Sequence, residues 1–176
     1  MSAINSQSLA NMDINKRIAK HFSDSAELKL RVKDSLAKPI AAAAQAFFDC
    51  VTNDRKILCC GNGGSAGDAQ HFAAELVNRF EKERTGLACI SLTTDSSIIT
   101  SIGNDYDFNQ IFSKQVNALG LPGDTLLAIS TSGNSPNVVA AIKAAHTRSM
   151  TVIALTGRNG GEMAKITDKA GIQFKI

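Results

Sequence analysis

The sequence predicts an α/β fold in which one parallel sheet is covered by helices on both faces. Five short apolar runs have the length and the flanking residues of buried strands, and helical stretches separate them. Strands that alternate with helices favour parallel pairing, and right-handed crossovers then produce a doubly wound sheet. The length of 176 residues suits one domain with a well-filled core.

The elements follow one another in a regular order along the chain. The predicted strands cover residues 56–60, 87–92, 125–129, 151–155 and 171–176. The predicted helices between them cover about residues 64–80, 108–119, 136–147 and 162–166. A doubly wound domain usually covers its last strand with a helix, so we expect a closing C-terminal helix that is absent from the given chain.

The segment before the first strand is predicted to be helical. Ile14, Ile18 and Phe22 are spaced by four residues, which places them on one face of a first helix. A second helix is expected over residues 25–52, and Pro39 within it is expected to cause a kink or a break.

Composition limits the classes of function. Residues 1–11 are rich in Ser, Asn and Gln and are expected to form a flexible lead-in to a single domain over residues 12–176. The net charge of +3 comes without a Lys/Arg cluster, so we expect no nucleic-acid partner, whereas small anionic metabolites remain candidates. We also expect no membrane partner, because no apolar run approaches the ~20 residues that span a bilayer.

Cysteine usage predicts a reducing compartment. The four cysteines are Cys50, Cys59, Cys60 and Cys89. No CxxC pair occurs, which argues against a cysteine zinc site, and neighbouring residues of a strand point to opposite faces. We therefore expect buried free thiols in a cytoplasmic protein.

The first predicted strand runs into a glycine-rich segment, residues 61–65, which we call the glycine loop. Three glycines in four residues permit positive φ angles and a close approach of the backbone to a ligand. The helix that follows presents free N–H groups and the positive end of its dipole to an anion. The pattern is neither a P-loop nor a GxGxxG fingerprint. The alternative to an anion-binding loop is a plain tight turn that binds no ligand.

The third predicted strand ends in a hydroxyl-rich segment, residues 130–135, which we call the serine loop. Its four hydroxyls come from Ser130, Thr131, Ser132 and Ser135, and Pro136 then starts a helix. Neutral donors beside a helix N-terminus suit a phosphate monoester. The alternative is that Ser135 caps the helix and the other hydroxyls have no function.

The helix after the glycine loop carries His71 and Glu75, four residues apart on one face. Such a pair is able to bind a divalent metal, and Glu75 is also able to move protons. Asp68 and Arg79 are expected to extend the same ridge. The alternative is an ordinary surface pair, and the position just after a predicted phosphate loop favours the functional interpretation.

These segments together resemble the phosphoheptose isomerases, a family of sugar isomerase (SIS) domain proteins. The resemblance runs from about Met12 to the last residue. It rests on the segments 60–65, 70–76, 103–105, 130–135 and 154–157, followed by Gly160 and Gly161. It implies a three-layer αβα sandwich with a five-stranded parallel flavodoxin-like sheet and N-terminal helices. It also implies a homotetramer with sites at subunit interfaces.

The resemblance implies an activity and the residues that perform it. The family interconverts sedoheptulose 7-phosphate and D-glycero-D-manno-heptose 7-phosphate through an enediol, at the entry to ADP-heptose for the lipopolysaccharide core. By carry-over, Glu75 is the catalytic acid/base, and His71 and Glu75 are two ligands of one zinc ion per subunit. The implied substrate-binding residues are Asn62, Gly63, Gly64, Ser65, Glu75, Asn104, Asp105, Ser130, Thr131, Ser132 and Ser135. Within this set the hydroxyls hold the phosphate, and Asn62, Asn104 and Asp105 contact the sugar.

Two other functions remain open at this point. The first is a non-catalytic SIS-domain scaffold that binds the replication initiator protein; that relative lacks an acidic residue at the position of Glu75, which is present here. The second is the phosphosugar-sensing domain of a regulator, which needs an attached DNA-binding module. In the isomerase family a Gln and a His on the C-terminal helix complete the metal shell, and they are expected beyond residue 176.

Overall fold

The structure is a computed structural model that describes residues 13–157, 159–167 and 171–175, with backbone only for the last range. The chain divides into two compact units, Met1–Ala37 and Lys38–Ile176. The predicted lead-in, residues 1–11, lies outside the described residues. In the first unit the described residues are Asp13 and the N-terminal part of helix α2 (Ile14–Thr52), whose side chains there are mostly exposed.

The two helices expected before the first strand are one helix. Helix α2 contains Pro39 in its interior, so the expected break does not occur. Proline removes one backbone hydrogen bond from a helix, and the Ala-rich sequence after it has a high helix propensity that supports continuation. In the second unit the C-terminal part of α2 buries Ala43 and Cys50.

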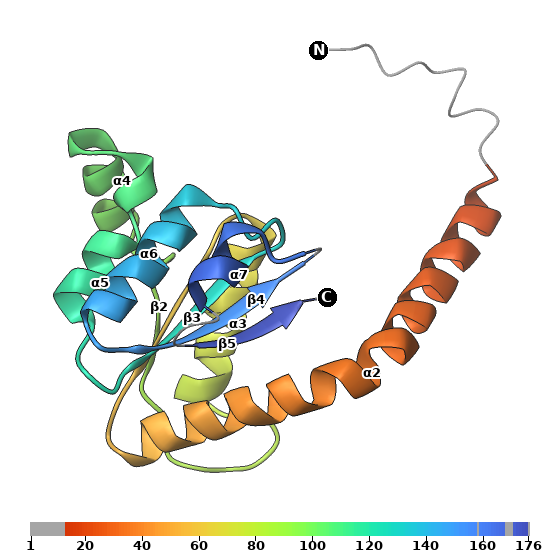
Figure 1. Cartoon of the computed structure of the whole chain (residues 1–176), viewed down its shortest axis with the longest axis horizontal. Helices are drawn as coiled ribbons and strands as arrows, with labels where there is room; N and C mark the ends of the chain where they lie inside the picture. Colours follow the sequence, from red (N-terminus) through yellow and green to blue (C-terminus); the bar gives the residue numbers. More distant parts are fainter. Residues whose placement is uncertain (1–12, 158, 168–170, 176) are drawn as a thin grey trace. The chain divides into compact units, whose positions relative to one another are not determined.

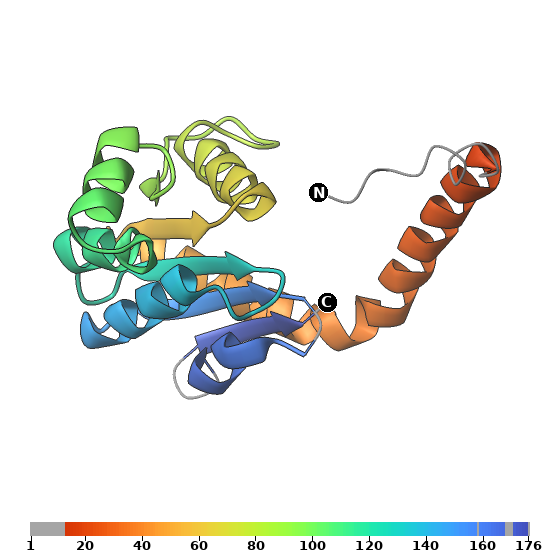
Figure 2. The same cartoon turned by 90° about the horizontal axis from the view of Figure 1, so that it is seen from above.

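The second unit contains the predicted parallel sheet. Its strands are β1 (Ile57–Gly61), β2 (Cys89–Ser91), β3 (Thr125–Ser130), β4 (Thr151–Thr156) and β5 (Gly171–Lys175). They pair in parallel in the order β2-β1-β3-β4-β5 (Figures 1 and 2). This is the order of a flavodoxin-like sheet, and the strand order reverses between β1 and β3. The predicted fold class is confirmed.

The helices of the second unit form two layers around the sheet (Figure 2). They are α3 (Gly64–Val77), α4 (Ser96–Asp105), η1 (Phe108–Gln110), α5 (Ser113–Leu119), α6 (Pro136–Thr147) and α7 (Gly161–Thr167). Helix α3 packs on one face of the sheet, against β1 and β2, and α6 and α7 pack on the other. The helix expected over residues 108–119 is divided into η1 and α5. Helix α3 ends at Val77 rather than near residue 80, so Arg79 lies beyond it.

Alternation along the strands divides the apolar side chains between the two faces. Leu58, Cys60 and Leu126 join the main core together with side chains of α5, α6 and α7. Leu127 and Ile129 lie on the opposite face and line open cavities. All four cysteines are buried free thiols, as predicted.

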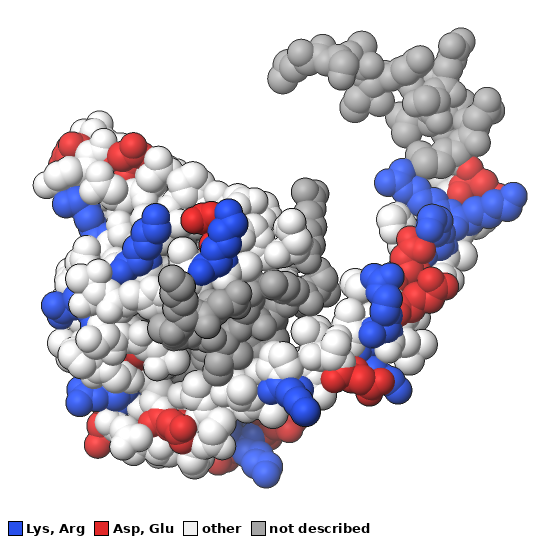
Figure 3. All heavy atoms as spheres, viewed as in Figure 1, with Lys and Arg blue, Asp and Glu red and all other residues white. Residues whose placement is uncertain are grey.

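No helix among the described residues combines the length and the apolar character that crossing a membrane requires. On the face seen in Figure 3, basic and acidic side chains are interspersed.

Candidate active site

The two predicted loops meet at the point where the strand order reverses. Strands β1 and β3 are neighbours, and the last residues in register are Gly61 and Ile129. The glycine loop and the serine loop therefore leave the carboxyl ends of adjacent strands. Ligands of open α/β sheets bind in the crevice at this topological switch point. The fold thus brings together the two segments that the sequence predicted as anion sites.

The glycine loop turns the chain directly into α3. Gly63 precedes the helix with a φ angle of 57°, a left-handed conformation that glycine adopts without strain. The Ser65 N–H donates to the Asn62 carbonyl over 3.0 Å. Beneath the loop, complete burial raises the pKa of the Cys60 thiol to about 12. Cys60 is therefore neutral near neutral pH and serves packing rather than chemistry.

The serine loop gathers its hydroxyls in one place. The Oγ of Ser130 lies 2.9 Å from the Oγ of Ser135 and 3.4 Å from that of Ser132. Ser135 occupies the N-cap position of α6, but its side chain makes no capping hydrogen bond. The alternative in which the Ser135 side chain only caps the helix is therefore wrong. Its hydroxyl belongs to the cluster that faces the switch point.

The segment after β4 holds the serine loop in place. The carbonyl of Thr131 accepts from the Gly157 N–H over 3.0 Å, and the carbonyl of Gly133 accepts from the Met163 N–H over 2.9 Å. Gly133 has a φ of 67°, and a β-carbon there would collide with the backbone of Gly160. This close approach of two loops explains the glycine at position 133.

Three adjoining cavities connect the serine loop with α3. The first, of about 230 Å³, is lined by Asn62, Ser65 and the four hydroxyl residues of the serine loop. It shares Ser65 and Thr131 with a second cavity of about 320 Å³. The second shares Asp68 with a third cavity of about 490 Å³, which contains His71 and Glu75. A trough with hydroxyls at one end and a His–Glu pair at the other follows from this arrangement.

His71 and Glu75 lie at the end of the trough opposite the hydroxyls. The Nε2 of His71 lies 3.0 Å from the Oε1 of Glu75, and their side chains are 74% and 36% exposed. His71 offers a ring nitrogen and Glu75 a carboxylate oxygen, and both kinds of atom bind zinc in proteins. Within the described part of the chain, no group of three or more His, Cys, Asp or Glu side chains is placed to hold a metal ion. These two residues therefore amount to part of a metal site.

Arg84, which no sequence motif marks, supports the helix end that carries Glu75. Its Nη2 donates to the carbonyl of Glu75 over 2.7 Å, and its Nη1 donates to that of Leu76 over 2.8 Å. These are carbonyls of the last turn of α3, which lack partners within the helix. No motif marks this contact, because Arg84 lies in an irregular segment whose path only the fold determines.

Asn104 and Asp105, which the family resemblance implies as sugar contacts, lie at the end of a helix. They form the last two residues of α4, which Asp95 caps by accepting from the Ile98 N–H over 2.9 Å. Asn104 donates to Asp105 over 2.8 Å, and both side chains are exposed. Neither lines the three cavities, so the described part of this chain does not bring them to the serine loop.

Comparisons with known proteins agree with the motifs. The SIS domain model matches residues 20–157. The phosphoheptose isomerase of Dechloromonas aromatica is 63% identical over 165 residues, which cover 94% of this chain and 84% of that protein. The chain belongs to the phosphoheptose isomerase family of SIS domain proteins.

Solved structures of family members share the fold. The phosphoheptose isomerase from Neisseria gonorrhoeae superposes with a TM-score of 0.87 at 51% identity, over 92% of this chain and 85% of that one. The family member from Francisella tularensis gives a TM-score of 0.87 at 44% identity, over 92% of this chain and 86% of that one. The predicted family is therefore confirmed, whereas the roles assigned to individual residues remain predictions.

Proposed function

We propose that this chain is an aldose–ketose isomerase that interconverts sedoheptulose 7-phosphate and D-glycero-D-manno-heptose 7-phosphate. The observation that carries the proposal is the trough that joins the serine loop to Glu75. A sugar phosphate has its anionic group at one end and its reacting carbons at the other, and the trough offers hydroxyl donors and a carboxylate in the same order. Relatives 54–64% identical to the chain bear the name of this enzyme.

The serine loop and the N-termini of α3 and α6 bind the phosphate in this mechanism. The hydroxyls of Ser130, Thr131, Ser132 and Ser135 with Ser65 donate to its oxygens. Asn62 contacts the sugar, and Gly63 and Gly64 let the backbone approach the ligand. Binding energy from the phosphate, which does not react, is used to orient the carbons that do.

Glu75 carries the proton between carbons. In the ketose-to-aldose direction its carboxylate takes a proton from C1, a double bond forms between C1 and C2, and the former carbonyl oxygen O2 takes up a proton from solvent to give the enediol. Glu75 then returns its proton to C2 while the C1–O1 bond becomes the aldehyde carbonyl, and the O1 hydroxyl releases its proton to solvent, which balances the proton taken up by O2. General acid–base catalysis of this kind contributes roughly 10²–10⁴-fold to the rate.

We propose that His71 and Glu75 also hold one zinc ion per subunit. Their donor atoms fit such an ion, and the family resemblance places a Gln and a His on the C-terminal helix as the remaining ligands. A zinc ion, when bound, polarises the sugar carbonyl. Equilibrium dialysis against zinc tests the assignment without recourse to activity, because His71→Ala is expected to lower the bound zinc.

We propose a cytoplasmic homotetramer with active sites at subunit interfaces, which acts in the first step of ADP-heptose synthesis for the lipopolysaccharide core. Exposed apolar side chains such as Phe48, Val77 and Phe80, which are 55–70% exposed, support burial of this surface in an assembly. In the assembly Asn104 and Asp105 are proposed to contact sugar bound at a neighbouring subunit. Sedimentation velocity measures the oligomeric state.

The scaffold that binds the replication initiator is the weaker alternative. Glu75, which that relative lacks, is present and lies at the trough, and nothing in the comparisons favours the scaffold. A direct assay separates the two functions. The zinc-supplemented protein is expected to convert sedoheptulose 7-phosphate, and Glu75→Gln is expected to abolish turnover while leaving the fold intact.

A matched variant makes this assay specific. Glu81 lies in the exposed segment after α3 and lines none of the three cavities. Glu81→Gln makes the same chemical change and is expected to keep full turnover. Normal turnover by Glu75→Gln would remove Glu75 from its role. An inactive wild type that binds the replication initiator would favour the scaffold.

A further inference from the structure

The side chains of Asn62 and Asn137 form a reciprocal amide pair. The Nδ2 of Asn62 donates to the Oδ1 of Asn137 over 2.8 Å, and the Nδ2 of Asn137 donates to the Oδ1 of Asn62, also over 2.8 Å. Asn62 belongs to the glycine loop, and Asn137 lies in the first turn of α6, two residues after the serine loop. The pair therefore links the two loops across 75 residues of sequence.

A backbone group fixes the orientation of both amides. The Val138 N–H donates to the Oδ1 of Asn137 over 2.9 Å. A backbone N–H is always a donor, so the atom that faces it has to be the oxygen of Asn137. The nitrogen of Asn137 then faces the oxygen of Asn62. One N–H of Asn62 is used by the pair, and its second N–H is left for a ligand in the cavity that Asn62 lines.

The amide pair lies just beyond the point where strands β1 and β3 stop pairing. Backbone pairing of β1 and β3 ends at Gly61 and Ile129. The chain then diverges into the two loops, and the amide pair connects them immediately beyond the sheet. Asn137 is 2% exposed, so it supports the cavity from behind rather than touching its contents. A buried amide with partners for its polar atoms holds a single arrangement, since breaking the pair leaves buried groups unsatisfied.

We propose that Asn137 is a positioning residue for the phosphosugar site, acting through Asn62. It holds the Asn62 amide with one N–H available to the ligand, and it fixes the separation of the glycine and serine loops. The inference rests on the proposed function, because it concerns the same cavity. A site whose donors are already placed binds its anion without a further ordering cost.

A double-mutant cycle tests this coupling. The variants are Asn62→Ala, Asn137→Ala and the double variant, each measured for KM and kcat with sedoheptulose 7-phosphate and for Kd with inorganic phosphate. Loss of a buried hydrogen-bonded partner corresponds to about a tenfold change in binding. Asn137→Ala is expected to raise KM and the phosphate Kd about tenfold. In the Asn62→Ala background the same change is expected to add little, because the residue through which it acts is gone.

A second substitution keeps the inference testable if the alanine variant does not fold. Asn137→Asp has nearly the same shape and still accepts from Val138 and Asn62, but it does not donate to the oxygen of Asn62. Its added charge weakens phosphate binding by itself, so it is compared with Asn62→Ala/Asn137→Asp. The effect of Asn137→Asp is expected to be larger when Asn62 is present.

The control is Ile142→Val, which removes buried volume from α6 more than one turn beyond Asn137 and touches neither amide. This variant is expected to lose stability but to keep the wild-type KM and phosphate Kd. Additive effects of the Asn62 and Asn137 substitutions, or an unchanged KM in a folded Asn137 variant, would overturn the inference. A wild type that neither binds phosphate nor turns over the sugar would instead overturn the proposed function.

Discussion

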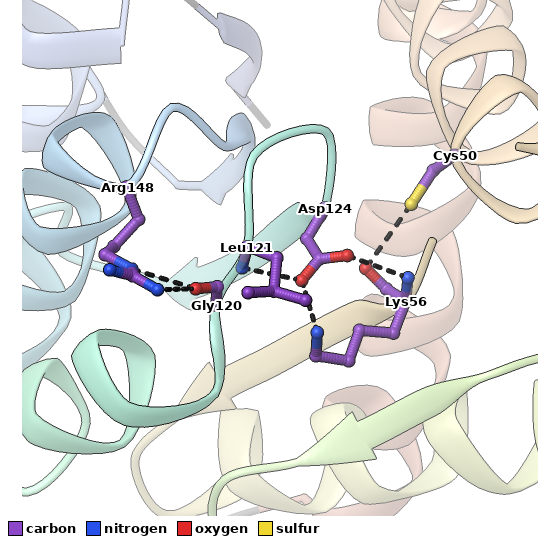
Figure 4. A network of polar contacts seen from close by, with 6 residues as sticks. All are labelled: Cys50, Lys56, Gly120, Leu121, Asp124 and Arg148. Atoms are coloured by element: carbon purple, nitrogen blue, oxygen red, sulfur yellow. Dashed lines mark hydrogen bonds and ion pairs between the residues drawn. The ribbon is translucent and has the colours of Figure 1, made fainter. Parts of the chain in front are cut away.

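The carboxylate of Asp124 lies 2.5 Å from the Nζ of Lys56, and its side chain is only 1% exposed. Its other oxygen accepts from the Lys56 backbone N–H over 3.0 Å, and the Leu121 N–H donates to the first oxygen over 2.8 Å (Figure 4). One carboxylate therefore joins the start of β1 to the turn that precedes β3. This network lies at the amino ends of the strands, opposite the loops of the candidate site.

Asp124→Asn is expected to lower the free energy of unfolding by about 3 kcal/mol. The substitution removes the charge that balances Lys56, and an amide nitrogen replaces one oxygen that now accepts hydrogen bonds. Urea denaturation measures the change. Asp54→Asn, the same substitution at an exposed site, is expected to have almost no effect. The KM of Asp124→Asn is expected to stay at the wild-type value, and a raised KM would show that the two ends of the strands are coupled.

Ser135→Ala is expected to affect binding far more than stability. An N-cap serine usually contributes about 1 kcal/mol through its side chain, but the hydroxyl of Ser135 faces Ser130 instead. We therefore expect KM to rise about tenfold while the unfolding free energy changes by less than about 0.5 kcal/mol. Ser101→Ala on α4 is the control for binding. A large loss of stability with an unchanged KM would restore the capping role.

Arg84→Ala is expected to lower kcat, because the guanidinium holds the last turn of the helix that carries Glu75. Its hydrogen bonds to the carbonyls of Glu75 and Leu76 are lost, and the unfolding free energy is expected to fall by about 1–2 kcal/mol. Arg84→Lys is expected to recover only part of kcat, since one ammonium does not reproduce the planar fork. The exposed Lys82→Ala is the matched loss of charge. Steady-state kinetics with equal kcat in all three variants would contradict this role.

Local pattern was sufficient to predict the sheet and the two polar loops at the ends of β1 and β3. Each central strand is an apolar run with polar or glycine flanks, and α6 begins and ends where its sequence predicted, at Pro136 and Thr147. At Pro39 the expected break does not occur, because a proline inside a helix removes one hydrogen bond without forcing the helix to end. Local rules describe what a residue prefers, and the surrounding helix decides whether that preference prevails.

Contacts between distant segments were beyond local prediction. Asn137 looks like an ordinary residue of a helix start until the pairing of β1 with β3 places Asn62 beside it. Arg84 gains its role in the same way, from the path of an irregular segment back to α3. His71 and Glu75 were predictable as a pair because helix geometry alone places residues four apart together.

Alkaline pH is expected to destabilise the fold through Cys60. Burial raises the pKa of this thiol from its ordinary value of 9.0 to about 12, so the folded protein keeps a proton that the unfolded chain releases. Between these two values the unfolded state binds fewer protons, and stability falls as pH rises. Below pH 9 both states are protonated, and this thiol adds no pH dependence.

The decrease of the unfolding free energy with rising pH is measurable. One thiol contributes about 1.4 kcal/mol per pH unit within the window. Urea denaturation at about pH 8, 9.5 and 10.5 is expected to give a flatter dependence for Cys60→Ala than for the wild type. Cys50 and Cys59 remain in that variant, and their pKa values are also raised, Cys50 by burial and Cys59 by its hydrogen bond with Cys89 and by burial. A part of the slope therefore persists, and an unchanged slope in Cys60→Ala would mean that Cys60 does not keep its proton through folding.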